Sequence, residues 1–257
     1  MSMMVKSNSS RSGNDPCLQV IDNESSRSDL ASRREVKFVF PGADVAKLRR
    51  LMECNGRRVI HQGPVSEVRS IYFDSPQLSA CQANLSGVSQ RRKTRLRWYD
   101  SLVPGDEAYF EIKWRENQMT GKYRLKMQAS PQLGAWSYRQ LVGGLLDTLP
   151  SDHVGRFLAG CDPVAIVEYR REHFVSPDGH LRATLDFDLA FYDQTGKQRI
   201  NTTFPRRMPG LVVLEVKADP KRVVELRELL FPLNPRVGRC SKYVHACRAL
   251  GLIGSAD

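Results

Sequence analysis

The chain has 257 residues and is strongly basic: 39 Lys and Arg residues stand against 28 Asp and Glu residues, which gives a formal net charge of +11. This excess favours polyanionic partners such as nucleic acid, anionic lipid or phosphate compounds. No apolar run reaches the roughly 18 residues of a membrane-spanning helix, and the six cysteines include no Cys-x-x-Cys pair, so we expect a cytoplasmic protein without a zinc site, a disulfide framework or a transmembrane segment.

The N-terminal part predicts a tail, two strands and a helix. Residues 1–31 are rich in Ser, Asn and Asp and show no apolar periodicity, which predicts a disordered tail. Residues 33–40 and 68–73 alternate between polar and apolar side chains and predict two strands. Asp44 can cap a helix between these strands. The polar stretch after the second strand predicts an irregular or briefly helical connection.

The middle part predicts a hairpin with an unusual charge pattern. Residues 93–99 and 107–115 predict its two strands, because Pro104-Gly105-Asp106 between them is typical of a turn. In both strands charged residues alternate with apolar ones, so a strand places all the charges on one face. Residues 122–127 continue the pattern and predict a fifth strand.

The C-terminal part supplies the remaining elements. Residues 163–174 and 181–191 predict a second hairpin around the turn sequence Ser176-Pro-Asp-Gly179, and residues 211–217 predict an eighth strand. The predicted helices after the first cover residues 136–149, 154–160, 220–231 and 241–250. The predicted fold is therefore mainly β (α+β), in one domain over residues 32–257.

The polar side chains of these strands do not form the mixed set that is usual on a solvated sheet face. The predicted charged faces carry Glu35, Lys37, Arg69, Arg95, Arg97, Glu111, Lys113, Lys122, Arg124, Lys126, Arg171, Arg182, Glu215 and Lys217. The predicted opposite faces carry Phe38, Tyr72, Trp98, Phe110, Trp114, Ile166 and Val216. One charged face is more often solvated surface, but repetition over most strands favours a functional face. We therefore predict an eight-stranded antiparallel β-barrel tunnel lined by charges, with helices capping and flanking it.

The composition of the predicted lining indicates its ligand. Many cations around few carboxylates favour a dense, extended anion, and a chain of phosphates fits best. A nucleic-acid partner is not expected, because stacking sites place aromatic residues beside the cations, whereas here the aromatic residues are predicted opposite them. Asp186 and Asp188 fit either a metal site or turn hydrogen bonds.

Seven short motifs occur in a fixed order along the chain. They are Ser70–Asp74, Arg95–Tyr99, Phe110–Lys113, Tyr169–Arg171, Leu181–Leu189, Leu214–Lys217 and Ser241–His245. Together they resemble the VTC (vacuolar transporter chaperone) polyphosphate polymerase domain, a member of the CYTH or triphosphate tunnel metalloenzyme superfamily. The resemblance extends from about Arg33 to Leu252, and it implies a basic β-barrel tunnel.

The resemblance also implies an activity and a set of ligands. The activity is a metal-dependent polyphosphate polymerase that transfers the terminal phosphate of ATP to a growing polyphosphate chain. The implied phosphate-holding and catalytic residues are Lys37, Arg69, Arg95, Arg97, Lys113, Lys126, Arg171, Arg182, Lys217 and Lys242, with Ser241 beside the last of them. Lys122 and Arg124 compete with Lys126 for its place.

The implied cofactor is Mn²⁺ or Mg²⁺, bound by Glu215 with Glu35 and Glu111 as helpers. One position departs from the superfamily pattern, since Arg33 stands where the first carboxylate of Glu-x-Glu-x-Lys is usual, and this favours phosphate binding through cations. Two alternatives stay open: a tripolyphosphatase or nucleoside triphosphatase of the same fold, and a non-catalytic polyphosphate-binding module. The sequence does not decide whether a membrane protein is a partner.

Overall fold

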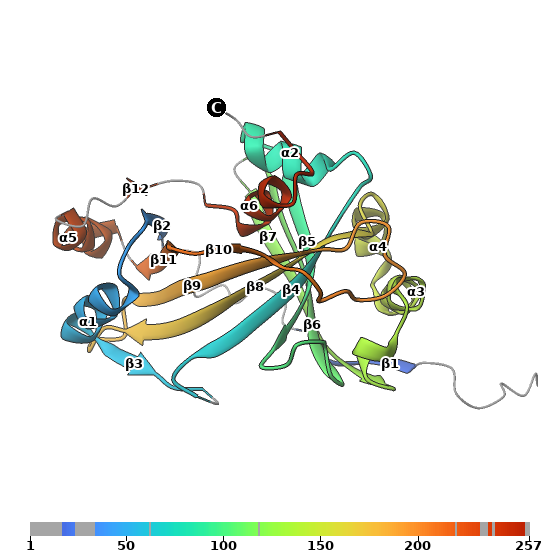
Figure 1. Cartoon of the computed structure of the whole chain (residues 1–257), viewed down its shortest axis with the longest axis horizontal. Helices are drawn as coiled ribbons and strands as arrows, with labels where there is room; N and C mark the ends of the chain where they lie inside the picture. Colours follow the sequence, from blue (N-terminus) through green and yellow to red (C-terminus); the bar gives the residue numbers. More distant parts are fainter. Residues whose placement is uncertain are drawn as a thin grey trace, which may run out of the picture.

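The computed structural model describes residues 17–23, 34–61, 63–117, 119–218, 220–231, 236–237 and 240–254. In these residues the chain forms a large twisted antiparallel sheet with helices packed against it (Figure 1). The strands are β1 (Cys17–Asn23), β2 (Arg34–Pro41), β3 (Arg57–Val59), β4 (Ser66–Asp74), β5 (Arg91–Tyr99), β6 (Glu107–Glu116), β7 (Met119–Ser130), β8 (Asp162–Val175), β9 (Arg182–Asp193), β10 (Arg206–Met208), β11 (Leu211–Ala218) and β12 (Arg236–Val237). The helices are α1 (Val45–Asn55), α2 (Ser79–Ser86), α3 (Tyr138–Thr148), α4 (Ser151–Leu158), α5 (Pro220–Leu230) and α6 (Lys242–Ala249), with a 3₁₀ turn η2 (Leu133–Ala135).

The sheet has twelve described strands in the order β1-β7-β6-β5-β4-β8-β9-β11-β2-β12, with β10 paired to β9 and β3 paired to β8. The prediction of a mainly β, antiparallel fold with flanking helices is confirmed. The prediction of a closed eight-stranded barrel is wrong, because no described ladder joins β1 to β12. The strand count differs by four: β1 falls within the predicted tail, and β3, β10 and β12 have only two or three residues, too few to show an alternating pattern.

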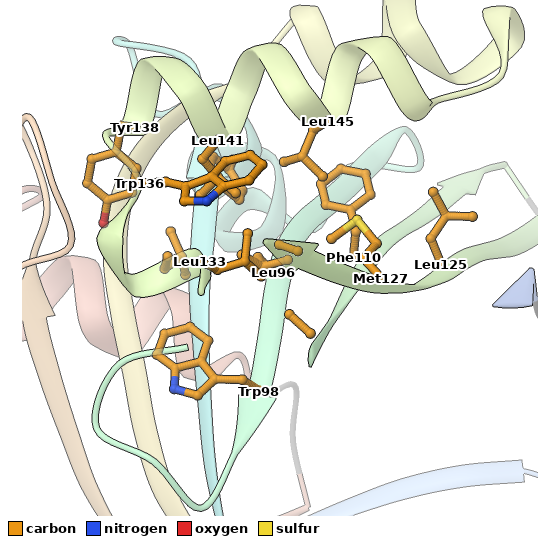
Figure 2. Close-up of a cluster of buried hydrophobic side chains, with 14 of the residues drawn as sticks. Leu96, Trp98, Phe110, Leu125, Met127, Leu133, Trp136, Tyr138, Leu141 and Leu145 are labelled. Atoms are coloured by element: carbon orange, nitrogen blue, oxygen red, sulfur yellow. The ribbon is translucent and has the colours of Figure 1, made fainter. Parts of the chain in front are cut away.

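The apolar face of the sheet is covered by helices at both ends. At one end, α3 lies over β5, β6 and β7 and buries Leu141 and Leu145 against Leu96 and Phe110 (Figure 2). A capping box starts this helix, because Ser137 Oγ accepts from the Gln140 amide while the Gln140 side chain accepts from the Ser137 amide. Burial of a Leu or Phe side chain in this cluster stabilises the fold by about 1.5–3 kcal/mol relative to leaving the side chain exposed.

At the other end, α1 and α5 pack on the apolar residues of β2 and β11. Leu48 of α1 and Leu226 of α5 belong to one buried cluster with Phe38 and Leu214. Asp44 caps α1 as predicted, since its carboxylate accepts from the Ala46 amide at 2.8 Å. These packed helices fix the face of β2 and β11 on which the charged residues lie.

Helix α6 packs on the opposite face of the sheet. Tyr243 and Cys247 are buried with Val167, Leu189 and Phe191 of β8 and β9. The first turn of α6 therefore lies on the face that carries the charged side chains.

The strand β1 was not predicted. Residues 17–23 fall in the range that the sequence assigned to a disordered tail, yet they pair antiparallel with β7, with Cys17 opposite Ser130. Leu18 packs against the cluster under α3, so this segment has an apolar anchor after all. The remaining residues of the predicted tail lie outside the described residues.

Candidate functional site

Three rows of side chains cross β5, β6 and β7 on one face of the sheet, which we call the basic face. The first row, which we call the lysine row, is Lys93, Lys113 and Lys122, in direct cross-strand register. The second row is Arg95, Glu111 and Arg124, and the third is Arg97, Tyr109 and Lys126. Like charges directly opposite each other destabilise a sheet, so the lysine row favours an anionic ligand.

Glu111 is the counter-ion of the second row. Its side chain is 2% exposed, and its oxygens accept from Arg95 Nε at 2.6 Å and lie 3.1 Å from Lys122 Nζ and 3.4 Å from Arg124 Nε. Burial raises the pKa of a carboxyl group, but Arg95 and the other cations outweigh burial and hold the pKa of Glu111 well below its usual range. The Glu111 carboxylate is therefore paired with three cations.

Arg97 is a buried cation with neutral partners. Its Nε donates to Ser70 Oγ at 3.3 Å and its Nη2 donates to the Tyr169 hydroxyl at 3.4 Å. Within the described ranges no carboxylate lies in ion-pair distance of its guanidinium. Burying a charge without a counter-ion is costly, so this position too favours an anion.

A second group of charges lies on β8 and β9 around the buried Asp186. Arg171 donates to Asp186 from Nε at 2.6 Å and from Nη2 at 2.8 Å, and Lys242 Nζ donates at 2.6 Å. Burial works against the charged carboxylate, but Arg171 and Lys242 lower the pKa of Asp186 to about 2. Asp186 is thus an ion-pair acceptor that fixes two cations, while the exposed Asp188 lies 3.5 Å from Arg170.

Strands β2 and β11 bring two carboxylates and two lysines together. Lys37 Nζ lies 3.2 Å from Glu35 and 3.3 Å from Glu215, and Lys217 Nζ lies 3.8 Å and 3.6 Å from the same two carboxylates. Burial opposes ionisation of Glu215, but Lys37 and Arg171 outweigh it and hold its pKa well below the usual range. Because both carboxylates share both lysines, their oxygens lie close together.

The carboxylates of Glu35 and Glu215 could hold a divalent cation together with oxygen atoms of a bound phosphate compound. Mg²⁺ and Mn²⁺ prefer oxygen ligands, and Mg²⁺ is commonly held by one or two carboxylates plus substrate phosphates. Glu215 and Glu35 match such a site. In the described ranges no three His, Cys, Asp or Glu side chains cluster as a complete protein-only metal site, so phosphate oxygens and water would supply the other ligands.

The sheet curls so that its two halves approach each other. Burial and Arg95 lower the pKa of Lys113 to about 8, while Glu35 and Glu215 act against this shift although β5, β4, β8 and β9 separate the strands. Charged groups from both halves of the sheet therefore act on Lys113.

The structure brings most of the predicted site residues to the basic face. They are Glu35, Lys37, Arg95, Arg97, Glu111, Lys113, Lys126, Arg171, Arg182, Glu215, Lys217 and Lys242, with Ser241 at the N-cap of α6. Lys122 and Arg124, which compete with Lys126, lie on the same face and contact Glu111, whereas Lys126 pairs with Glu107 at 2.9 Å. Their individual roles stay predictions.

Two residues lie on the other face from the one predicted. Arg69 points to the apolar face, where it donates to Glu168 at 2.7 Å and to the Ser101 carbonyl at 2.8 Å. Tyr72 lies on the basic face, where its hydroxyl accepts from Arg95 Nη1 at 3.0 Å. Both faces of β4 are buried, so the alternation of polarity on this strand did not show which face each side chain takes.

One residue of the basic face was missed. Lys93 Nζ donates to Ser241 Oγ at 3.0 Å, which links β5 to the start of α6. Lys93 alternates with Arg95 and Arg97 along one strand, so the sequence pattern was enough to predict that its side chain lies on the same face as the two arginines.

An antiparallel sheet that gathers this many cations on one curled face defines a class of proteins that bind extended polyanions. The model of the VTC domain family matches residues 32–251. The chain therefore belongs to the VTC domain family, and this membership implies a triphosphate or polyphosphate ligand.

Other comparisons are weaker. No curated protein matches the chain. Among solved structures 26 chains match, and one is a putative adenylyl cyclase from Hippeastrum that is described as having a dominant triphosphatase activity. It shares 15% identity, the match covers 82% of this chain and 93% of that chain, and the TM-score is 0.40, a similarity too low to support an argument about this protein. None of the helices in the described ranges is long and apolar enough to cross a membrane.

Proposed function

We propose that this protein is a metal-dependent polyphosphate polymerase, which moves the terminal phosphate of ATP onto a growing polyphosphate chain along the basic face. The observation that carries the proposal is a set of cations that, among the described residues, meet no carboxylate at ion-pair distance: Lys93, Arg97, Lys113 and Arg182. They lie next to cations that are already fixed by Glu111, Asp186 and Glu215. Their number and spread over several strands suit a chain of phosphates better than a single one.

The chemistry needs positioning and charge neutralisation more than covalent help. Arginine forks bind phosphate oxygens in two places at once, and Arg95 and Arg171 are held in fixed orientations by Glu111 and Asp186. Enzymes of this family are generally metal-dependent. Bound between Glu215, Glu35 and the phosphates, Mg²⁺ or Mn²⁺ would neutralise charge that develops on the phosphate oxygens.

Three carboxylates of the basic face are poor candidates for a general base that activates water. Activation of water needs a base with a pKa near the working pH. The pKa values of Glu111, Asp186 and Glu215 are all lowered by neighbouring cations, so these carboxylates are weak bases. The end of a polyphosphate chain is already an anion and needs little help from a base.

The test is an incubation of the purified full chain with ATP and either Mn²⁺ or Mg²⁺, followed by a gel that resolves phosphate chains. A ladder of chains supports the polymerase. Free phosphate without a ladder would establish the triphosphatase instead, and tight binding of triphosphate without turnover would establish a binding module. Glu215→Gln should abolish the metal-dependent ladder, and an unchanged ladder would show that the assigned metal position is wrong.

A further inference from the structure

The contact between Lys93 and Ser241 joins two distant parts of the chain at the basic face. Lys93 lies on β5 and Ser241 precedes α6, and Lys93 Nζ donates to Ser241 Oγ over 3.0 Å. The same oxygen accepts a hydrogen bond from the Val244 amide at 3.4 Å, as the N-cap of the helix. Ser241 therefore holds the lysine in place while the helix holds the serine.

These two contacts determine what the serine hydroxyl can do. A hydroxyl has one donor and two acceptor sites. Both acceptor sites of Ser241 Oγ are taken, by Lys93 and by Val244. In the described ranges no group accepts from the hydroxyl hydrogen, so Ser241 keeps a free donor at the edge of the basic face.

Lys93 also has hydrogen-bond donors that no described residue uses. An ammonium group has three donors and no acceptor, and Ser241 is its partner among the described residues, which leaves two donors unused. Among the residues that the structure describes, no carboxylate lies at ion-pair distance from the ammonium, and Lys113 lies directly across from it in the lysine row. Burial, together with Lys37 and Arg95, lowers the pKa of Lys93 to about 8 although Tyr72 acts in the opposite direction.

Donors without acceptors, and positive charge without a counter-ion, call for a compact and highly charged anion. A terminal phosphate carries about 1.5 to 2 negative charges at neutral pH, by analogy with a phosphate monoester, whereas a phosphate inside a chain carries one. A lysine ammonium is a point charge that suits such a group, while arginine forks suit a pair of oxygens. Arg95 and Arg97 follow Lys93 along the same face of β5, in a line that an extended chain can follow.

We propose that Lys93 and the Ser241 hydroxyl form a subsite for the terminal phosphate of the bound chain, and so distinguish a chain end from the phosphates within a chain. The inference rests on the proposed function, since it takes the ligand to be a phosphate chain. It assigns a role to Lys93 as a specificity-determining residue.

Calorimetric titration of the full chain with two probes tests the subsite. Tripolyphosphate has two terminal phosphates, and cyclic trimetaphosphate has the same number of phosphorus atoms and no terminal phosphate. We expect the wild type to prefer tripolyphosphate, and Lys93→Met to lose about tenfold to a hundredfold of this preference, the range of one hydrogen bond to a charged group. Ser241→Ala should lose part of the preference, and Lys93→Arg should keep more of it than Lys93→Met.

The controls separate the possible failures. Lys197→Met removes an exposed lysine on a distant turn and should leave the preference unchanged, and thermal melts report whether each variant is folded. If Lys93→Met weakened both probes by the same factor, Lys93 would be a general cation and the subsite would be wrong. If the wild type bound neither probe, the proposed function itself would be overturned.

Discussion

Replacing Glu111 by Gln should destabilise the free protein strongly. The carboxylate is 2% exposed and holds Arg95, Lys122 and Arg124. Removing one partner from a buried ion-pair group leaves uncompensated charge and costs about 3–5 kcal/mol. For a domain of this size about 1 kcal/mol corresponds to about 2–4 °C in Tm, so we expect Tm to fall by about 6–20 °C.

The same variant should respond unusually to a phosphate ligand. Any ligand that binds only the folded state stabilises it and so raises Tm. At a ligand concentration of about a hundred times Kd, the free energy of unfolding increases by about 2.7 kcal/mol. In Glu111→Gln the released cations are free to bind phosphate oxygens, so tripolyphosphate should raise the Tm of the variant by more than that of the wild type. Thermal melts followed by circular dichroism, with and without tripolyphosphate, measure both effects.

The matched control is Glu107→Gln, on the same strand. Glu107 pairs with Lys126 at 2.9 Å but is 46% exposed, and exposed ion pairs contribute about 0–1 kcal/mol. Glu107→Gln should therefore change Tm by a few degrees at most. A fall in Tm for Glu111→Gln that is no larger than for this control would refute the view that Glu111 is the counter-ion of the basic face.

Three further predictions follow from the charges and the sheet edge. Asp186 has its pKa lowered from 3.8 to about 2, so its stabilisation is present above about pH 4 and is lost as pH falls toward 2; acid unfolding should be steeper in the wild type than in Asp186→Asn, and equal profiles would count against the ion pair. Because the pKa values of Lys93 and Lys113 are both lowered to about 8, the affinity for tripolyphosphate should fall as pH rises above 8. Lys93→Arg should show a smaller fall, since only Lys113 then loses its charge in this range, and a fall equal to that of the wild type would contradict this. Deletion of residues 1–23 exposes the edge of β7 and should lower Tm, and an unchanged Tm would show that β1 adds no stability.

The faces of most strands could be predicted because period-two alternation is a local property. Lys37 and Glu215 each alternate with large apolar residues along their strands, and burial of those apolar residues under α1 and α5 sends both charges to the basic face. The same rule failed at Arg69, since β4 is buried on both faces and the partner Glu168 lies on another strand. No local pattern contains that pairing.

The absence of a ladder between the edges of the described sheet, and the pairing of β1 with β7, could not be predicted for a similar reason. Alternation determines which way a side chain points, but the meeting of two edge strands depends on twist accumulated over the whole sheet. Residues 17–23 place Leu18, Val20 and Ile21 in a short segment within a long polar stretch, and their strand pairs along the edge of β7, which would otherwise leave backbone groups unpaired. Both outcomes depend on distant partners.

The most direct test of the basic face compares two buried arginines on neighbouring strands. Arg97 lies on the basic face and Arg69 on the apolar face, at 8% and 7% exposure. Calorimetric titration with tripolyphosphate should show an affinity about tenfold to a hundredfold lower for Arg97→Gln, the range expected from the loss of one hydrogen bond to a charged group. For Arg69→Gln the affinity should stay within about threefold of the wild type, a change smaller than that range. Equal losses in the two variants, or a larger loss for Arg69→Gln, would contradict the assignment of phosphate binding to this face.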